Sequence, residues 1–277
     1  MTITPGQLSS YYADGFLVLD SFVDHNECDA LRSRAAELVA EFDPAGLVSI
    51  FSTHEQSRLA DEYFLTSGDK IRFFFEENAF RDDGRLKQEK ERSINKIGHA
   101  LHDLDPVFGQ FSRSHKIKEL VDGLSIVNPL LLQSMYIFKQ PKIGGEVSCH
   151  QDSTFLYTEP IDIAGLWFAL EDATIENGCL WAIPGGHNLG LKSRWVRSPN
   201  GGMEFKTYDA EPWPEADLVP LEVKKGSLIV LHGLLPHRSF ENKSPNSRHA
   251  YTLHVIGGNA HYPTENWLQR SMPLHGF

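Results

Sequence analysis

The chain has 277 residues, and 26 Lys and Arg against 37 Asp and Glu give it a formal net charge of −11. With 41% hydrophobic and 23% charged residues, its composition is that of an ordinary globular protein. The length favours one elaborated domain over residues 1–277. The acidic balance excludes a nucleic-acid surface and an anionic membrane surface as the main partner, so we expect no nucleic acid and no membrane.

The cysteine and histidine counts narrow the chemistry. The three cysteines, Cys28, Cys149 and Cys179, include no CxxC pair, which excludes a disulfide framework and a zinc ribbon. Unpaired cysteines and an N-terminus without a basic, apolar signal predict a reducing, cytoplasmic setting. The longest apolar runs, such as residues 163–170, are far short of the ~20 residues that a membrane span needs. Thirteen histidines direct attention to a metal site.

Helices are predicted in the first half of the chain. Thr4-Pro5 is typical of a helix start and predicts a short helix to about Asp14. Residues 16–22, after Gly15, are predicted to form a strand. A second helix follows Asp24, because apolar residues recur there at steps of three and four. These apolar positions are Cys28, Leu31, Ala35, Leu38, Val39 and Phe42. A third helix is predicted over residues 106–122.

From about Leu130 the pattern changes to short runs of β-branched and aromatic residues separated by Gly, Pro and Asn. Asn177-Gly178 lies between two apolar runs and predicts a β-hairpin. Helices followed by strands favour a mainly β fold, a β-sandwich or jelly roll buttressed by N-terminal α-helices, over an alternating βαβ fold.

The segment 187–214 departs from this pattern, because it is polar and rich in glycine. It carries Lys192, Arg194 and Arg197 before any acidic residue. One interpretation is a solvated surface loop. The other is a lid whose positive charge faces an anionic group of the substrate, since long connections inside a domain are often functional.

The triplet His150-Gln151-Asp152 is a candidate metal site. In a strand, residues two apart point to the same face, so both side chains could reach one ion. A chain with thirteen histidines contains such triplets by chance, and His25-Asn26-Glu27 has similar chemistry. That second triplet lies in a predicted helix, where its ends do not share a face, and we expect it to be solvated.

The segment GSLIVLHGLLPHRSF offers a third ligand. His232 follows a buried apolar run and is interpreted as a structural histidine or one that supports a ligand. His237 completes a set of two histidines and one carboxylate, the facial triad of non-haem Fe(II) oxygenases, which leaves positions for a bidentate co-substrate and O₂. Arg248, eleven residues later, would supply a planar fork for a carboxylate.

The ordered segments CHQDSTFLYTEP, GLWFALEDATIENGCLWAIPGGH and GSLIVLHGLLPHRS, followed by Arg248, resemble the phytanoyl-CoA dioxygenase family. YYADGFLVLDSFVDHNECDAL and INKIGHALH resemble the same family, so the likeness covers essentially the whole chain. The resemblance implies a double-stranded β-helix (a jelly-roll, cupin-like core), Fe(II), 2-oxoglutarate as co-substrate, and O₂.

Site residues follow from this resemblance position by position. The implied iron ligands are His150, Asp152 and His237. Arg248 and Ser239 would hold the distal carboxylate of 2-oxoglutarate, and three further positions match co-substrate contacts: Lys96, Met135 and Trp167. Asp152 favours hydroxylation, because a halogenating relative would have a small residue there. The substrate is expected to be a small molecule, with an acyl-CoA and other organic compounds as alternatives.

Two other functions compete with a 2-oxoglutarate-dependent hydroxylase. One is a non-oxidising module that binds metal and 2-oxoglutarate and acts as a sensor or scaffold. The other is a cupin-like metal enzyme that uses no 2-oxoglutarate. Intact His150, Asp152, His237 and Arg248 favour the dioxygenase. No feature of the sequence predicts an oligomeric state.

Overall fold

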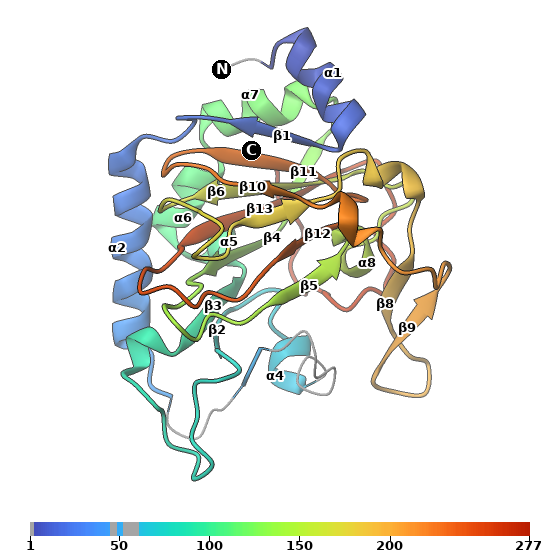
Figure 1. The fold of residues 1–277 in the computed structure, drawn as a ribbon. Coiled ribbons are helices and arrows are strands. Elements are labelled where there is room, and N and C mark those ends of the chain that lie inside the picture. The colour runs from blue at the N-terminus through green and yellow to red at the C-terminus, as the bar shows by residue number, and fades with distance from the viewer. Residues whose placement is uncertain (1–2, 45–48, 52–60) are drawn as a thin grey trace.

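The structure, a computed structural model, describes residues 3–44, 49–51 and 61–277 (Figure 1). Its large sheet has seven antiparallel strands, in spatial order β1 (Phe16–Leu19), β11 (Leu228–His232), β6 (Ile163–Ala169), β13 (Ala250–Gly257), β4 (Pro129–Ile137), β3 (Ile94–His99) and β2 (Ile71–Phe75). The small sheet has four strands, in the order β10 (Val219–Leu221), β7 (Leu180–Ala182), β12 (His237–Ser239) and β5 (Val147–His150). A separate hairpin joins β8 (Ser193–Arg197) to β9 (Met203–Thr207).

Helices lie mainly before the small sheet in the chain. They are α1 (Pro5–Asp14), α2 (His25–Glu41), α4 (Glu62–Leu65), α5 (Leu101–Leu104), α6 (Pro106–Ser112), α7 (His115–Gly123) and α8 (Asp152–Phe155), with short 3₁₀ turns at Lys90–Arg92, Gly186–Leu189 and Glu215–Asp217. None of the helices in the described ranges is long and apolar enough to cross a membrane. The mainly β fold with N-terminal helices confirms the predicted fold class.

The strands at the centre of the large sheet are buried on both faces. In β13, Tyr251, Leu253 and Val255 pack with residues of α1, α2, α6 and α7 in the main hydrophobic core. The alternate residues Thr252 and His254 face a cavity between the two sheets. Successive side chains of a strand point to opposite faces, so one face of β13 is apolar and the other carries polar groups. The large sheet therefore supports the helices on one side and the site on the other.

Local sequence determines the first two helices. Thr4 Oγ1 accepts the backbone N–H of Gln7 at 3.2 Å, and Gln7 Oε1 accepts the backbone N–H of Thr4 at 2.9 Å, which forms a capping box at the start of α1. Four of the predicted apolar positions of α2 are buried: Cys28, Leu31, Ala35 and Val39. Leu38 and Phe42, which follows the end of the helix, are partly buried against the same core. Both helices confirm the prediction.

Two predicted elements differ in extent. The predicted helix over 106–122 is interrupted, because Ser114 has extended backbone angles (φ −63°, ψ 148°) and α7 starts after it. The strand predicted over 16–22 ends at Leu19, because the chain turns at Ser21 (φ 53°). Phe22 is nevertheless buried in the main core. Apolar periodicity therefore located the buried residues better than it located the ends of elements.

The hairpin predicted at Asn177-Gly178 is wrong. The preceding strand β6 pairs with β11 and β13, whereas the following strand β7 pairs with β10 and β12 of the other sheet. The turn itself exists, since Gly178 has φ 83° and Asn177 Oδ1 accepts the N–H of Thr174. It carries the chain from one sheet to the other, because the strands before and after it each pair, within their own sheet, with strands that are distant in sequence.

Phe168 tests the packing of the large sheet against the helices. It is fully buried and contacts the rings of Phe22, Phe111 and Tyr251. We expect Phe168→Ala to lower the free energy of unfolding by about 3–5 kcal/mol, because it leaves a cavity that the surrounding rings cannot fill. Urea denaturation measures the change, with exposed Tyr208→Ala as the control. A loss as small as that of the control would contradict the packing described.

Candidate active site

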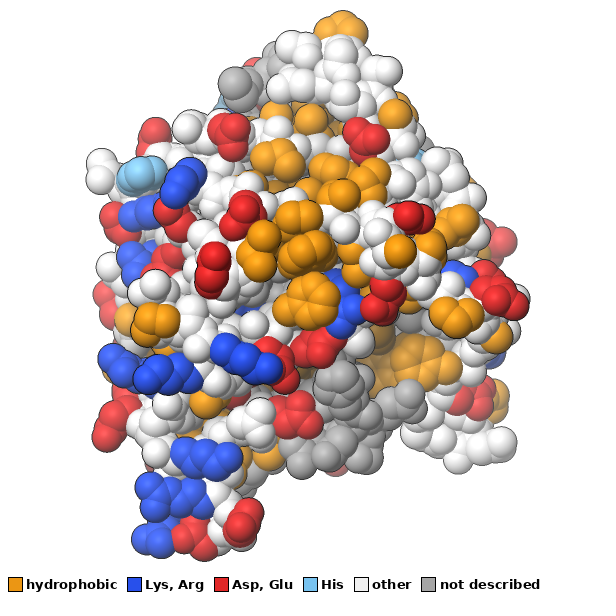
Figure 2. All heavy atoms as spheres, in the orientation of Figure 1, with side chains coloured by type: hydrophobic (Ala, Val, Ile, Leu, Met, Phe, Trp, Pro, Cys, Tyr) orange, Lys and Arg blue, Asp and Glu red, His pale blue; other side chains and the backbone are white. Residues whose placement is uncertain are grey.

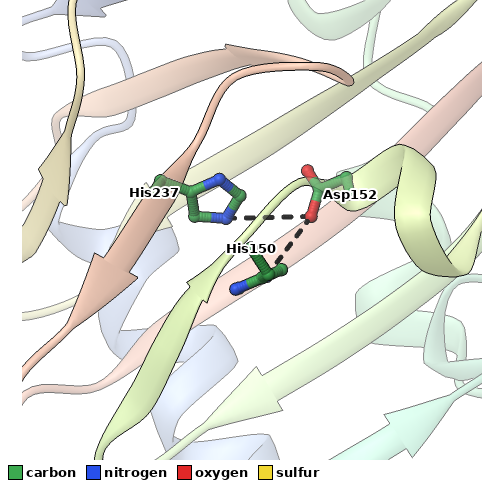
Figure 3. Close-up of side chains that lie close together, drawn as sticks. All are labelled: His150, Asp152 and His237. Carbon is green, nitrogen blue, oxygen red and sulfur yellow. Dashed lines mark ion pairs between the residues drawn. The ribbon is translucent and has the colours of Figure 1, made fainter. Parts of the chain in front are cut away.

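Three predicted ligands converge at one end of the small sheet (Figure 3). His150 and His237 are direct register partners in the antiparallel pair of β5 and β12, so their rings lie side by side at 4.4 Å. Asp152 is the first residue of α8, where its Oδ1 lies 3.9 Å from His150 Nε2 and 3.7 Å from His237 Nε2. The three ligand atoms lie within 4.8 Å of one another.

The route by which Asp152 reaches the cluster differs from the prediction. We expected both residues of the triplet to lie on one strand face, but the strand ends at His150 and a single helical turn begins at Asp152. The backbone of Gln151 makes the change of direction. The side chain of Gln151 fixes this corner by donating to the carbonyls of Gly190 and Leu234, each at 2.8 Å.

Hydrogen bonds orient both imidazole rings. His150 Nδ1 lies 2.8 Å from the Ser148 carbonyl and His237 Nδ1 lies 2.9 Å from the Leu235 carbonyl. A carbonyl only accepts, so each Nδ1 carries the proton and each Nε2 lone pair points toward Asp152. Burial, together with the nearby His237, lowers the pKa of His150 to about 4, which keeps the ring in the neutral form that binds metals.

Asp152 is an anion in a buried place. Burial raises the pKa of its carboxyl group, but the nearby His254 and His237 lower the pKa by more than burial raises it. The pKa of Asp152 therefore lies well below the usual value. Its Oδ2 is buried and accepts no hydrogen bond from any residue in the described ranges. The neighbouring strand leaves room only because residue 165 is glycine, since a Cβ there would lie 2.8 Å from Oδ2. Two neutral imidazoles and one buried carboxylate oxygen fit a divalent metal ion.

His254 is a site residue that the sequence analysis missed. It lies on β13 with Nε2 at 3.4 Å from Asp152 Oδ2, and it is buried. The sequence does contain a signal for His254. Every second residue of a strand points to the same face, so Thr252 and His254 lie on the same face as Arg248, and both line the cavity.

Arg248 occupies the closed side of the same cavity. It is only 2% exposed, and its guanidinium donates to the Gly178 carbonyl at 3.1 Å and to Ser239 Oγ at 3.3 Å. Ser239 Oγ also donates to the Gly178 carbonyl, at 2.9 Å. Among the described residues, the buried Nη1 atom of Arg248 has no hydrogen-bond partner, and no carboxylate forms an ion pair with the guanidinium. A buried cation without an anion is costly, so the arrangement fits an anionic ligand.

The other predicted co-substrate positions line this cavity too. Lys96 on β3 is nearly buried, with Nζ 3.1 Å from the centre of the Phe51 ring. Burial lowers its pKa to about 7, against the opposing charge of Glu76. Met135 on β4 and Trp167 on β6 form part of the wall, and the Trp167 ring lies 5.1 Å from Arg248 Cζ. All eight predicted site residues line one cavity of about 700 Å³.

The segment 187–214 is not an open polar loop. Most of it forms the β8–β9 hairpin, and its cations are engaged within the protein. Lys192 pairs with Asp209 at 2.5 Å, and Arg194 pairs with Glu265 at 2.7 Å. Arg197 donates to the backbone carbonyls of Leu65 and Trp267. Neither the solvated loop nor a lid with free positive charge describes this segment.

The remaining histidines discussed above lie away from the triad. His25 is exposed at the start of α2, as expected. His232 ends β11, where its Nδ1 accepts the N–H of Leu234 and its ring lies 5.0 Å from that of His187. These contacts give His232 a structural role at the end of the strand.

Comparison with known proteins identifies the family. The sequence profile of the phytanoyl-CoA dioxygenase (PhyH) family matches residues 11–250. The chain belongs to the phytanoyl-CoA dioxygenase family. It is 54% identical to phytanoyl-CoA dioxygenase 1 of Oryza sativa over 276 residues, which is 98% of this chain and 96% of that protein. It is 47% identical to phytanoyl-CoA dioxygenase domain-containing protein 1 of Bos taurus over 281 residues, covering 98% and 97%. The resemblance drawn from the sequence is confirmed.

Solved structures confirm the fold. The α-ketoglutarate-dependent carbocyclase SnoK superposes with a TM-score of 0.65 at 17% identity, over 94% of this chain and 86% of that chain. EctD from S. alaskensis, with 2-oxoglutarate and 5-hydroxyectoine, gives a TM-score of 0.63 at 19% identity, over 92% and 76%. The fold of this family member is therefore the double-stranded β-helix.

Gly165 tests whether the Asp152 pocket holds a metal ion. We expect Gly165→Ala to weaken metal binding by about 10- to 100-fold, because the new methyl group displaces the carboxylate that it would meet at 2.8 Å. Anaerobic Fe(II) titration or Mn(II) binding measures the affinity. Gly6→Ala is the control, since a Cβ there meets nothing within 4 Å. Unchanged metal affinity in the Gly165 variant would contradict the assignment of this pocket.

Proposed function

We propose that this protein is an Fe(II)- and 2-oxoglutarate-dependent dioxygenase that hydroxylates a small organic substrate. The observation that carries the proposal is the buried, unpaired Arg248, which lines the same cavity as the His150, Asp152 and His237 cluster. The double-stranded β-helix and the dioxygenase family membership support it.

His150, Asp152 and His237 would hold the iron, which would supply activation of O₂ and oxidation of a substrate C–H bond, coupled to decarboxylation of 2-oxoglutarate to succinate. The protein's own contribution is positioning. The two Nδ1 hydrogen bonds hold the imidazole rings so that both Nε2 atoms face Asp152. Three protein ligands leave the rest of the coordination sphere to the co-substrate and O₂.

Arg248 and Ser239 would bind the distal carboxylate of 2-oxoglutarate. Arg248 is held in place by the Gly178 carbonyl, so its free Nη1 is already oriented before a ligand arrives. Met135 and Trp167 would pack against the carbon chain. Lys96 lines the same cavity and would be a further contact of the co-substrate.

The competing functions make different demands on this site. A cupin-like enzyme without 2-oxoglutarate would have no use for a buried Arg248 without a partner. A binding module would keep Arg248 but release no succinate. The two solved relatives described above are a carbocyclase and a protein bound to 5-hydroxyectoine, so hydroxylation by this chain remains our proposal. The three free cysteines are in keeping with the proposed cytoplasmic setting.

Succinate formation tests the reaction. With Fe(II), 2-oxoglutarate and O₂, we expect the purified protein to release succinate, detected by mass spectrometry. His150→Ala and Asp152→Ala should abolish it, because each removes a metal ligand. His25→Ala is the matched control, since that histidine begins a similar triplet on an exposed helix face. Undiminished turnover in either ligand variant, or no turnover in the native protein, would overturn the proposal.

Binding of 2-oxoglutarate tests Arg248 separately from catalysis. We expect Arg248→Met to weaken binding by about 100-fold, equivalent to about 2.7 kcal/mol, because the distal carboxylate loses a buried, charge-assisted partner. The shift in thermal unfolding midpoint with added 2-oxoglutarate under anaerobic conditions provides the measurement. Arg85→Met is the control, because Arg85 is exposed and pairs with Asp83. Equal shifts in the two variants would favour a metal enzyme that does not use 2-oxoglutarate.

A further inference from the structure

A second buried cation lies beside Arg248 at the closed end of the cavity. Lys139 follows β4, lines the same cavity and is 2% exposed. Its Nζ donates to the Gly145 carbonyl at 2.5 Å and to the Ser239 carbonyl at 3.5 Å. Both of these partners within the described part of the chain are neutral, so neither compensates a positive charge on Lys139.

Lys139 contacts each of the groups that hold Arg248 in place. Its backbone carbonyl accepts the Arg248 N–H at 3.3 Å, and its ammonium reaches the backbone of Ser239, whose Oγ accepts from the Arg248 guanidinium. Its side chain packs against Gly178, because a Cβ at that residue would lie 2.7 Å from Lys139 Cε. A carboxylate that binds Arg248 would therefore act on Lys139 at short range.

One buried carboxylate faces Lys139 across Gly145. Glu76 directly follows β2 and is fully buried, and its Oε2 accepts the Gly145 N–H at 3.0 Å and Asn95 Nδ2 at 2.8 Å. Gly145 joins the two charged groups, since its N–H donates to Glu76 and its carbonyl accepts from Lys139. When Arg248 and Lys139 are both protonated, Glu76 opposes two cations, and an incoming carboxylate would balance the second.

The other carboxylates around Lys139 already have cationic partners. Glu146, which precedes β5, pairs with Arg238, and Glu241, which follows β12, pairs with Lys243 at 2.6 Å. The outer face of the small sheet carries mainly hydrophobic side chains (Figure 2). A positive charge on Lys139 therefore has to be balanced inside the protein.

The surroundings of Lys139 make its charge depend on what binds nearby. Burial and the charge of Arg248 lower the pKa of Lys139 to about 7, against the opposing charges of Glu76, Glu146 and Glu241. A carboxylate bound to Arg248 would favour the protonated form, because it adds a negative charge beside the ammonium. Below this pKa, Lys139 is protonated with or without the ligand. Above it, binding has to take up a proton.

We propose that Lys139 is a proton-accepting residue of the co-substrate site, which becomes charged when the distal carboxylate of 2-oxoglutarate binds Arg248 and Ser239. This proposal rests on the proposed function. The proton comes from solvent and goes to Lys139 Nζ, and no bond of the ligand forms or breaks. Lys139 acts through Arg248 and Ser239, so it is a positioning residue, and it makes the affinity for the co-substrate depend on pH.

Proton uptake during binding tests the proposal. 2-Oxoglutarate is titrated by calorimetry into the anaerobic, Mn(II)-loaded protein at pH 8, in buffers of different ionisation enthalpy. Bound Mn(II) keeps the three metal ligands deprotonated. We expect the native protein to take up about half a proton or more per ligand, and its affinity to fall about tenfold between pH 7 and pH 9. Binding without proton uptake at pH 8 would overturn the proposal.

Lys139→Met separates proton uptake from a purely structural role. The variant keeps a side chain against Gly178 and removes the ammonium. We expect it to take up about half a proton less than the native protein and to bind 2-oxoglutarate about fivefold more weakly at pH 7, with a flatter pH dependence. A structural role alone would weaken binding equally at every pH and leave proton uptake unchanged, which would contradict the proposal. Lys224→Met is the control, because Lys224 is exposed and pairs with Asp172.

Lys96 has to be distinguished from Lys139, because it lines the same cavity and its pKa is also lowered to about 7. We expect Lys96→Met to retain the proton uptake that Lys139→Met loses. The reverse result would assign the proton to Lys96 and overturn the proposal. Glu76→Gln provides a second variant. It removes a carboxylate that raises the pKa of Lys139, so the fall in affinity should begin at a lower pH, and an unchanged pH dependence would count against the proposal.

The same samples separate the two proposals. If 2-oxoglutarate gives no thermal shift with the native protein and no succinate forms, the proposed function fails. If binding depends on Arg248 but takes up no proton, only the role of Lys139 fails. The thermal unfolding midpoint also reports that each lysine variant is folded.

Discussion

The pairing of β5 with β12 is the constraint on which the rest of the site depends. It places His150 directly opposite His237, although 86 residues separate them in the chain, and so brings two ligands together without any local contact. Backbone carbonyls beside the same two strands orient both rings. The large sheet supplies the remaining requirement, a glycine at residue 165 that leaves space for Asp152. The cluster of His150, Asp152 and His237 is therefore a property of sheet pairing as much as of ligand chemistry.

The cations that line this cavity differ in whether the described part of the protein supplies a carboxylate partner. Arg248 is held by a carbonyl and a hydroxyl, neither of which neutralises it, so its burial is compatible with folding only if an anion or water compensates. Lys192 and Arg238 have carboxylate partners and act as structural cations of the outer part. Positive residues near a site therefore indicate an anionic ligand only where the fold has not already paired them.

Gly178 lies at the turn that was wrongly predicted to join paired strands, and it also contacts the residues of the site. Asn177-Gly178 has the composition of a hairpin turn, and the positive φ of Gly178 agrees with it. The strands on either side join different sheets, and the Gly178 carbonyl is left to accept from both Arg248 and Ser239. A Cβ at this position would lie 2.7 Å from Lys139 Cε and from the Phe240 carbonyl, so close packing as well as backbone conformation requires glycine. The sequence predicted the turn correctly, but the strands on either side of it pair with strands that are distant in the sequence.

The sequence by itself determined the fold class and the first two helices, and it singled out the three side chains that the structure brings together, His150, Asp152 and His237. Those predictions rest on information that is local in the chain, such as caps, apolar periodicity and an ordered set of motifs that resembles one family. Only the tertiary structure decided that His254 faces Asp152, that the segment around Lys192 is a paired hairpin, and that Arg248 has no carboxylate partner among the described residues. Each of these depends on which groups meet across the two sheets, and burial and pairing between distant residues are not encoded in the spacing of either residue alone.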